Sequence, residues 1–433
     1  MRSQGQPVRV LGLFDSICII VGIIVGTGIF MTPMSVAQLV PSVPMILLAW
    51  TLAGAMCLAG ALCYAELATT YPAVGGEYVY FSRSFGQWAG FLFSWSKMLV
   101  IRTGSIAAMA FAFGTYAEQV FPLGSYGVGL YASSAIIILT VVNIAGVRAG
   151  STSQNILTVA KICGVVAVLV VAALYPAPSV SIGTIAESPT FPGFMVAMIL
   201  ILWTYGGWNE TAYVAAEVRD PDRNLPRSIT YGTLLVIFLY ICINGAFLWT
   251  LGVGGVASSE AVAADCIGGA FGDAGRRFIS VLVVVSALGA VNGLILTGAR
   301  ISYAMGAETA LFGLLGRWNA RLGVPVWSLL VQGTIAIALV WTGSFETLVE
   351  YTAAAAWLFF ALVPLSLIVL RMRDSETPRK YHVPLYPFVP IIFCLVSIYM
   401  IYSSINYAGV GALYGFLIVL SGLPVYWFAR RVG

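Results

Sequence analysis

Two short stretches decide the fold of this chain: GIIVGTGIF at residues 22–30 and WTYGGWN at residues 203–209. Each places closely spaced glycines inside a long apolar segment. Glycine costs a helix about 1 kcal/mol per site relative to alanine, so both runs predict a break in a helix. One glycine pair alone is explained by close packing of membrane helices. Two breaks at matching positions of a repeated chain instead predict a binding site at that depth.

The composition places both stretches in lipid. Of the 433 residues, 60% are hydrophobic and only 9% are charged, whereas a soluble domain carries about 25% charged residues. This balance excludes a disordered chain, a nucleic-acid-binding domain and an ordinary soluble enzyme. The net charge of +4 is too small to indicate a class of partner.

Apolar segments of about 20 residues, the length that crosses a bilayer, recur along the chain. We predict an all-α integral membrane protein with twelve transmembrane helices. We expect the first to be retained, because no signal-peptide cleavage pattern follows it. The spans are 14–40, 43–69, 87–118, 126–145, 154–175, 191–216, 229–251, 277–308, 324–342, 351–370, 388–407 and 409–429.

Lysines and arginines predict the orientation. With the N-terminus in the cytoplasm, fifteen of the 21 basic residues fall on the cytoplasmic side and only Arg276 and Arg277 fall outside. Because cytoplasmic loops carry the excess of Lys and Arg, we predict a multi-pass protein of the cell membrane with both termini cytoplasmic.

The spacing of unusual spans predicts an internal repeat. The two glycine stretches lie in spans one and six, and the two overlong spans are three and eight. Each half then contains five spans. Because five is an odd number, the second half starts on the opposite side of the membrane from the first. We predict a five-plus-five inverted repeat with discontinuous helices 1 and 6. Helices 1–5 occupy residues 1–175, helices 6–10 residues 191–371, and helices 11–12 with the C-terminus residues 387–433.

The broken helices predict the kind of ligand. Half-helix N-termini present unpaired N–H groups to an anion, and unwound carbonyls face a cation. A zwitterionic α-amino acid carries both groups.

At these residues the sequence resembles the amino acid–polyamine–organocation superfamily, and within it the L-type amino acid transporters and their bacterial exchanger relatives. The match covers nearly the whole chain. Its motifs are GTGIF at 26–30, YGGWN at 205–209, Glu217 with PDRNLPR at 221–227, VNG at 291–293 with Ala299 and Arg300, YAEL at 64–67 through Pro72, and GGEY at 75–78.

The resemblance implies amino acid exchange or symport by alternating access. It places the substrate carboxylate at Gly26, Thr27 and Gly28. It places the ammonium group near the carbonyls of Ile23, Ile24 and the run Trp203, Thr204, Tyr205 and Gly206. It makes Trp203 the gate, where many L-type relatives carry Phe. It makes Asn209 a polar residue of the pocket.

The resemblance also gives Lys161 a role. In relatives, an amine at this position of the fifth helix occupies the place that a sodium ion takes in sodium-coupled transporters. By that match, Lys161 would contact the backbone of residues 23–26 and Ser286. Snorkelling from a helix end is the alternative for such a lysine.

The other charged residues in or near the spans receive structural interpretations. Lys97 and Arg102 are five apart, so we expect them on different helix faces. We expect Glu66 and Glu77 to pair with cytoplasmic arginines, and the loop 217–227 to brace an inner gate. Glu210 either biases the site toward cationic substrates or, as we prefer, faces another helix or the outer vestibule.

Cysteine and histidine usage predicts no metal site and no cofactor. There is one histidine, His382, and the seven cysteines form no CxxC pair. In animal relatives a cysteine between helices 3 and 4 tethers a glycoprotein subunit. Residues 119–125 contain no cysteine, so we expect no disulfide-linked heavy subunit.

The sequence therefore predicts a sodium-independent exchanger of neutral L-amino acids. Proton-coupled symport, or transport of cationic amino acids or polyamines, remains the alternative on the same fold. A membrane-embedded enzyme needs a nucleophile–base pair or a metal cluster, which His382 alone does not supply. A channel would show repeated charged rings or subunit symmetry.

Overall fold

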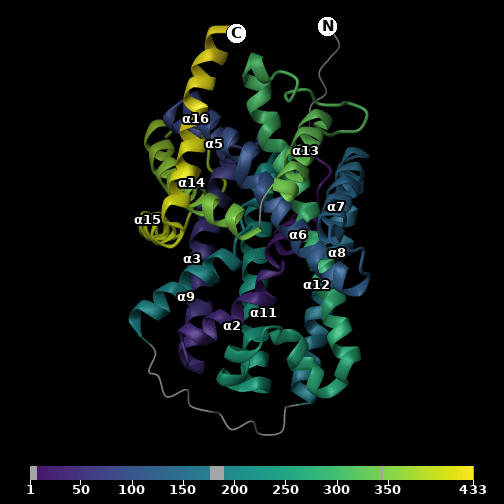
Figure 1. Cartoon of the computed structure of the whole chain (residues 1–433). Helices are drawn as coiled ribbons and strands as arrows, with labels where there is room; N and C mark the ends of the chain where they lie inside the picture. The colour runs from purple at the N-terminus through teal and green to yellow at the C-terminus, as the bar shows by residue number, and fades with distance from the viewer. Residues whose placement is uncertain (1–6, 176–189, 343–344, 433) are drawn as a thin grey trace.

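The computed structural model describes residues 7–175, 190–342 and 345–432, and these residues form helices joined by short connections (Figure 1). Two isolated bridges, Leu11–Val218 and Asn319–Val324, are the extended pairings within these ranges. The chain is an all-helical, multi-span membrane protein, as predicted.

Within the described ranges, nine helical segments are long and apolar enough to cross a bilayer. One of them joins three elements, α5 (Gln87–Ser96), η1 (Lys97–Ile101) and α6 (Arg102–Val120), end to end. The other eight are α3 (Val43–Thr70), α7 (Gly127–Ile144), α8 (Val147–Leu174), α11 (Pro221–Ser258), α12 (Val262–Glu308), α14 (Phe345–Arg373), α15 (Phe388–Ala408) and α16 (Val410–Val432).

A tenth span is formed by two helices that meet at an angle. Helices α1 (Leu13–Ile24) and α2 (Gly28–Leu39) pass the same test together and are bent by 45° at the break between them. The break falls in the GTG run, where the sequence predicted it.

The remaining two predicted spans, 191–216 and 324–342, contain the shorter apolar helices α9 (Phe191–Thr204) and α13 (Val326–Thr342). After α9 the chain leaves the helix and resumes in α10 (Glu210–Tyr213), as the second glycine stretch predicted. The other short elements are α4 (Glu77–Phe85), η2 (Ala215–Glu217) and η3 (Ala310–Phe312).

Several predicted boundaries are wrong because helices continue beyond their apolar windows. The span predicted over 229–251 lies inside α11, whose first turns are charged yet helical. Helices α11 and α12 also run past bends at Gly252 and Gly272, whose φ angles of 67° and 54° favour glycine. The span predicted over 154–175 begins earlier, at Val147.

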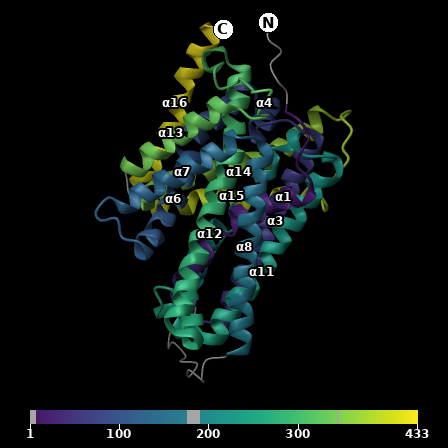
Figure 2. The ribbon, with the colours of Figure 1, turned by 90° about the vertical axis from the view of Figure 1, so that its right-hand side faces the viewer.

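The packing surrounds the two breaks with long helices. Helix α11 packs along α3 and α1, while α12 packs along α6 and α8; α8, α11 and α12 extend together toward one end of the molecule (Figure 2). The C-terminal end of α16 lies at the opposite end (Figure 1). Three buried aromatic rings, Trp50, Tyr205 and Tyr240, pack with centroids 4.9–5.9 Å apart where α3 and α11 meet the second break.

Candidate functional site

A cavity of about 360 Å³ lies where the two breaks meet. Its walls come from both sides of the α1–α2 break, from the segment between α9 and α10, and from η1 and α6, with further residues from α12 and α14. All nine residues predicted to bind substrate line it: Ile23, Ile24, Gly26, Thr27, Gly28, Trp203, Thr204, Gly206 and Asn209.

The first break exposes backbone donors at the start of α2. The Gly26 N–H bonds to the Ile24 carbonyl at 2.7 Å instead of continuing the helix, and the Phe30 N–H bonds to the Thr27 carbonyl at 3.0 Å. Within the described residues, the N–H groups of Thr27, Gly28 and Ile29 have no backbone acceptor. A helix N-terminus with free N–H groups and a positive dipole end favours an anionic group.

The second break is a tight backbone turn. The Gly206 N–H donates to the Trp203 carbonyl at 3.0 Å, and Gly207 has a φ of 125°. A Cβ atom at Gly207 would lie 3.0 Å from the side chains of Ile23 and Ile24, so glycine lets the two breaks approach closely.

Two contacts tie the breaks together. The Tyr240 hydroxyl of α11 donates to the carbonyls of Ile24 and Thr204, at 2.7 and 3.4 Å. The hydroxyls of Thr32 and Thr204 lie 2.8 Å apart and join α2 to α9. No sequence pattern points to Tyr240, because its role comes from packing of α11 against both breaks.

Lys161 lies beneath the first break and is fully buried. Its Nζ donates to the carbonyls of Gly22 at 2.7 Å, Val25 at 2.9 Å and Ser286 at 3.0 Å. A Cβ atom at Gly289 would lie 2.7 Å from this Nζ, so glycine there leaves room for the amine. The amine therefore bridges the end of α1 to α12, and a snorkelling position is excluded.

The expectation that Lys97 and Arg102 lie on different faces is wrong. Residues 97–101 form a turn of π-helix, in which the Arg102 N–H bonds to the Lys97 carbonyl five residues back. In this wider turn, residues five apart lie closer to one face than they would in an α-helix, so both side chains reach the same side. Both residues are buried and line the cavity.

Glu210 pairs with Arg102 inside the molecule, at 3.0 Å between Oε1 and Nη1. Its other oxygen accepts a hydrogen bond from the Thr297 hydroxyl at 2.6 Å. Glu210 therefore faces neighbouring helices, as the preferred interpretation held, while still lining the cavity.

The expectation that Glu77 pairs with a cytoplasmic arginine is also wrong. Its Oε1 accepts hydrogen bonds from the hydroxyls of Tyr64 and Tyr213 and from the Asn209 amide, at 2.7, 2.8 and 3.0 Å. Glu77 is the buried first residue of α4, and its partners are phenols on α3 and α10 and the amide of the residue before α10. Asn209 is thus held from behind while it lines the cavity.

Glu66 does pair with arginines, as predicted. It accepts a hydrogen bond from Arg371 Nε at 2.7 Å and lies 3.5 Å from Arg379 Nε. Nearby, the Tyr71 hydroxyl donates to Asp374 at 2.9 Å. Burial and this hydrogen bond raise the pKa of Tyr71 to about 12, so the phenol stays protonated at neutral pH.

The segment 217–227, expected as a loop, is mostly helical, because η2 ends at Glu217 and α11 begins at Pro221; it starts in another buried ion pair. Glu217 binds Arg300 through two hydrogen bonds of 2.9 Å, and both side chains are fully buried. The Glu217 carbonyl also accepts from the N–H groups of Val10 and Leu11 at 2.9 Å. These contacts fasten the chain before α1 to α12.

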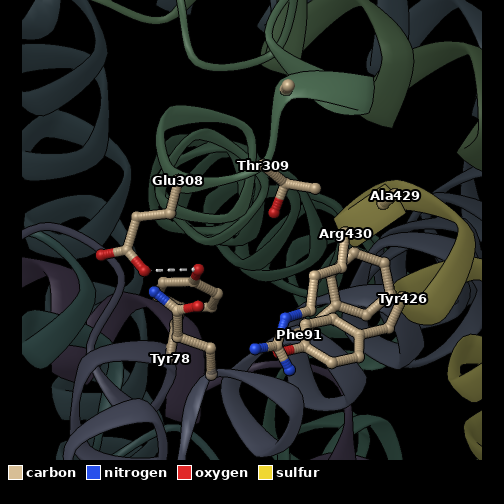
Figure 3. Close-up of a pocket in the computed structure, with 9 residues that line it drawn as sticks. Tyr78, Phe91, Glu308, Thr309, Tyr426, Ala429 and Arg430 are labelled. Atoms are coloured by element: carbon tan, nitrogen blue, oxygen red, sulfur yellow. Dashed lines mark hydrogen bonds between the residues drawn. The ribbon is translucent and has the colours of Figure 1, made fainter. Parts of the chain in front are cut away.

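A second, smaller cavity of about 210 Å³ lies among α4, α5, the end of α12 and α16 (Figure 3). Tyr78 donates to Glu308 at 2.9 Å on one side, and Tyr426 and Arg430 of α16 lie on the other. Its lining includes no residue of either helix break, so the larger cavity is the candidate site. In the described part of the chain, no three His, Cys, Asp or Glu side chains gather to hold a metal.

Comparison with known proteins identifies the family of the chain. Residues 11–429 match the family model for amino acid permeases. The chain is 35% identical to b(0,+)-type amino acid transporter 1 of Mus musculus, over 96% of this chain and 87% of that protein. It is 30% identical to the serine/threonine exchanger SteT of Bacillus subtilis (strain 168), over 97% of each.

It is also 31% identical to large neutral amino acids transporter small subunit 2 of Rattus norvegicus, over 96% of this chain and 80% of that protein. The chain therefore belongs to the amino acid permease family. It is a membrane transporter and not an enzyme, and the resemblance drawn from its motifs is confirmed.

Proposed function

We propose that this permease exchanges neutral L-amino acids by alternating access, without sodium. The observation that carries the proposal is the single cavity shared by both helix breaks, with free N–H groups at the start of α2. The name of the Bacillus subtilis relative supports exchange as the mode of transport.

In this proposal the substrate lies across the two breaks. Its carboxylate accepts hydrogen bonds from the backbone at Gly26, Thr27 and Gly28. Its ammonium group binds backbone carbonyls of Ile23 and Ile24 and of residues 203–206. Trp203 covers the site as a gate. The Ile23 carbonyl has no backbone donor within the described residues, which supports this orientation.

Lys161 is proposed to replace a coupling cation. Its amine lies among three carbonyl oxygens, from Gly22, Val25 and Ser286, which is the kind of shell that would otherwise hold Na⁺. A fixed protein amine there makes transport independent of external sodium, while still linking α1 to α12.

The fold is proposed to be a five-plus-five inverted repeat of twelve spans. The first repeat occupies residues 1–175, the second 191–371, and two appended helices 387–433. The breaks after α1 and after α9 support this division, because each falls in the first span of its half. Helices α9 and α13 count as spans in this scheme.

We further propose a plasma-membrane location with both termini cytoplasmic, as the basic residues indicate. The pairs Glu217–Arg300 and Glu66–Arg371 then close the cytoplasmic side. The most exposed lining residues, Met31 and Trp203 at 51% and 40%, lie on α2 and α9, which supports an outward-facing conformation. Because residues 119–125 lack cysteine, no disulfide-linked heavy subunit is needed.

Reconstitution in liposomes tests the proposal. Vesicles containing the purified chain are loaded with unlabelled amino acids in sodium-free buffer, and uptake of labelled amino acid is measured. Exchange predicts that internal amino acid accelerates uptake. Uptake into empty vesicles that needs an inward proton gradient would indicate symport instead. Dependence on sodium would refute the role given to Lys161.

A further inference from the structure

Lys97 and Arg102 form a cationic surface on the cavity, named here the basic wall. The π-helical turn of η1 brings the two residues onto one face of the helix, five positions apart. Lys97 is 7% exposed and Arg102 is 3% exposed, and both line the cavity. Two buried cations at a binding cavity are costly unless they interact with something, so the basic wall needs partners.

Protein groups accept hydrogen bonds from only some of the donors of the basic wall. Arg102 uses Nη1 to bind Glu210, but its buried Nε and Nη2 have no hydrogen-bond partner. Lys97 Nζ lies near the rings of Phe93 and Phe360, at 5.5 and 5.8 Å from their centroids. No hydrogen bond or ion pair to Lys97 Nζ occurs within residues 7–175, 190–342 and 345–432. The wall therefore offers unused hydrogen-bond donors.

The charges around the basic wall balance. Glu210 offsets Arg102 by direct contact. Glu77 lies behind the cavity, where Tyr64, Tyr213 and Asn209 donate three hydrogen bonds to its Oε1, while its buried Oε2 has no hydrogen-bond partner among the described residues. Two cations and two carboxylates sum to zero, so a bound side chain needs no charge of its own.

We propose that the basic wall recognises the substrate side chain and selects amino acids whose uncharged side chain carries a hydrogen-bond acceptor, a hydroxyl or a carboxamide. This inference rests on the proposed function. If the breaks hold the α-amino and α-carboxylate groups, the side chain is the part left to reach α6.

The face of α6 leads from the first break to the basic wall. Met109 Sδ lies 3.8 Å from the Thr27 hydroxyl at the break. Ser105 and Arg102 follow at one-turn spacings toward η1, and both line the cavity. A side chain that extends from a substrate at the break along this face meets the guanidinium of Arg102 and then the amine of Lys97.

Donor chemistry sets the order of preference. Lysine and arginine side chains donate hydrogen bonds and cannot accept them. A hydroxyl or carboxamide oxygen pairs with them, whereas an apolar side chain leaves them unpaired and shut off from water. A cationic side chain adds repulsion. The basic wall therefore opposes the transport of cationic amino acids that Glu210 alone had suggested.

Competition against labelled uptake by the reconstituted full-length chain tests this. The competitors are serine, threonine, asparagine and glutamine, then leucine, then lysine and arginine, then aspartate and glutamate. The variant is Lys97→Met, which keeps an unbranched side chain and removes the amine. The matched control is Arg148→Met, because Arg148 is an exposed basic residue at the start of α8.

We expect the wild type and Arg148→Met to prefer the four polar uncharged amino acids. In Lys97→Met, their advantage over leucine should fall about tenfold, the effect of one charge-assisted hydrogen bond. Leucine exchange by the same variant shows that it is folded. An unchanged ratio of polar to apolar substrates in Lys97→Met overturns the inference, as does effective competition by lysine or arginine.

If aspartate or glutamate competes better than the uncharged amino acids, the charges around the basic wall do not balance. The inference that it selects uncharged side chains is then overturned. Failure of any amino acid to exchange in the wild type would instead contradict the proposed function itself. The two failures are therefore distinguishable.

Discussion

Lys161 donates hydrogen bonds to backbone carbonyls at the broken end of α1. Where α1 stops, the carbonyls of its last turn lose the N–H partners that a continuing helix would provide. The amine takes over at Gly22 and Val25 and adds the Ser286 carbonyl of α12. One residue thus stabilises both the shape of the break and its distance from α12.

Replacing Lys161 by methionine should therefore destabilise the fold and stop exchange. The variant leaves three carbonyls without a donor, but it also removes the cost of burying an ammonium group. We expect the free energy of unfolding to fall by about 2–4 kcal/mol. Thermal unfolding in detergent and exchange in liposomes measure the two effects. A variant that exchanges at the wild-type rate would remove Lys161 from the mechanism.

Gly26 offers a cleaner separation of binding from stability. A Cβ atom there would lie 3.6–3.9 Å from Met109, Ile23 and Ala290, which are ordinary contacts among residues that line the cavity. Gly26→Ala should leave the melting temperature nearly unchanged and weaken substrate binding about tenfold or more, because the methyl group occupies substrate volume.

Gly245→Ala is the matched control for Gly26→Ala. Gly245 lies on α11, and a Cβ atom there would meet nothing within 4 Å. Equal apparent affinities for labelled amino acid in both variants would show that the first break does not contact the substrate.

At the scale of elements, the glycine stretches predicted the two breaks because the cost of glycine in a helix is local. The π-turn of η1 was not predictable from the residues KMLVI, since a π-turn depends on the packing around it. Because of that one turn, Lys97 and Arg102 lie on the same side of the helix and not on different faces, as the sequence had indicated. The partners of Glu77 were missed for a similar reason, because they come from α3, from α10 and from Asn209 just before α10, which the sequence does not place together.

The C-terminal part of α12 is fastened by the pair Glu217–Arg300, and this contact gives a prediction about an element. Glu217→Gln leaves Arg300 buried without a counter-charge, which costs about 3–5 kcal/mol for pairs of this kind. We expect a lower melting temperature and a leak or loss of exchange, because the loop before α11 no longer holds the residues before α1 against α12.

The exposed pair Arg276–Asp265, 3.5 Å apart, is the control for Glu217→Gln. Asp265→Asn should cost about 0–1 kcal/mol, as surface ion pairs do. Equal unfolding temperatures for the two variants would show that the buried pair does not stabilise the fold.

For the whole molecule, the apolar pattern was sufficient to predict a helical membrane protein and the approximate place of the ten spans that the described residues show. It did not predict where helices end outside the bilayer, because α11 and α12 continue through charged turns and glycine bends. The cavity itself required three-dimensional structure, since its walls come from seven α-helices and η1, spread between residues 23 and 360.

The central claim is that the two helix breaks form one amino acid site. The most direct test is an experimental structure of the chain bound to an amino acid that it exchanges. We predict ligand density between Gly26–Gly28 and residues 203–206, with its side chain toward Arg102. Density elsewhere, such as in the smaller cavity beside Tyr78 and Arg430, with the breaks empty, would contradict the account.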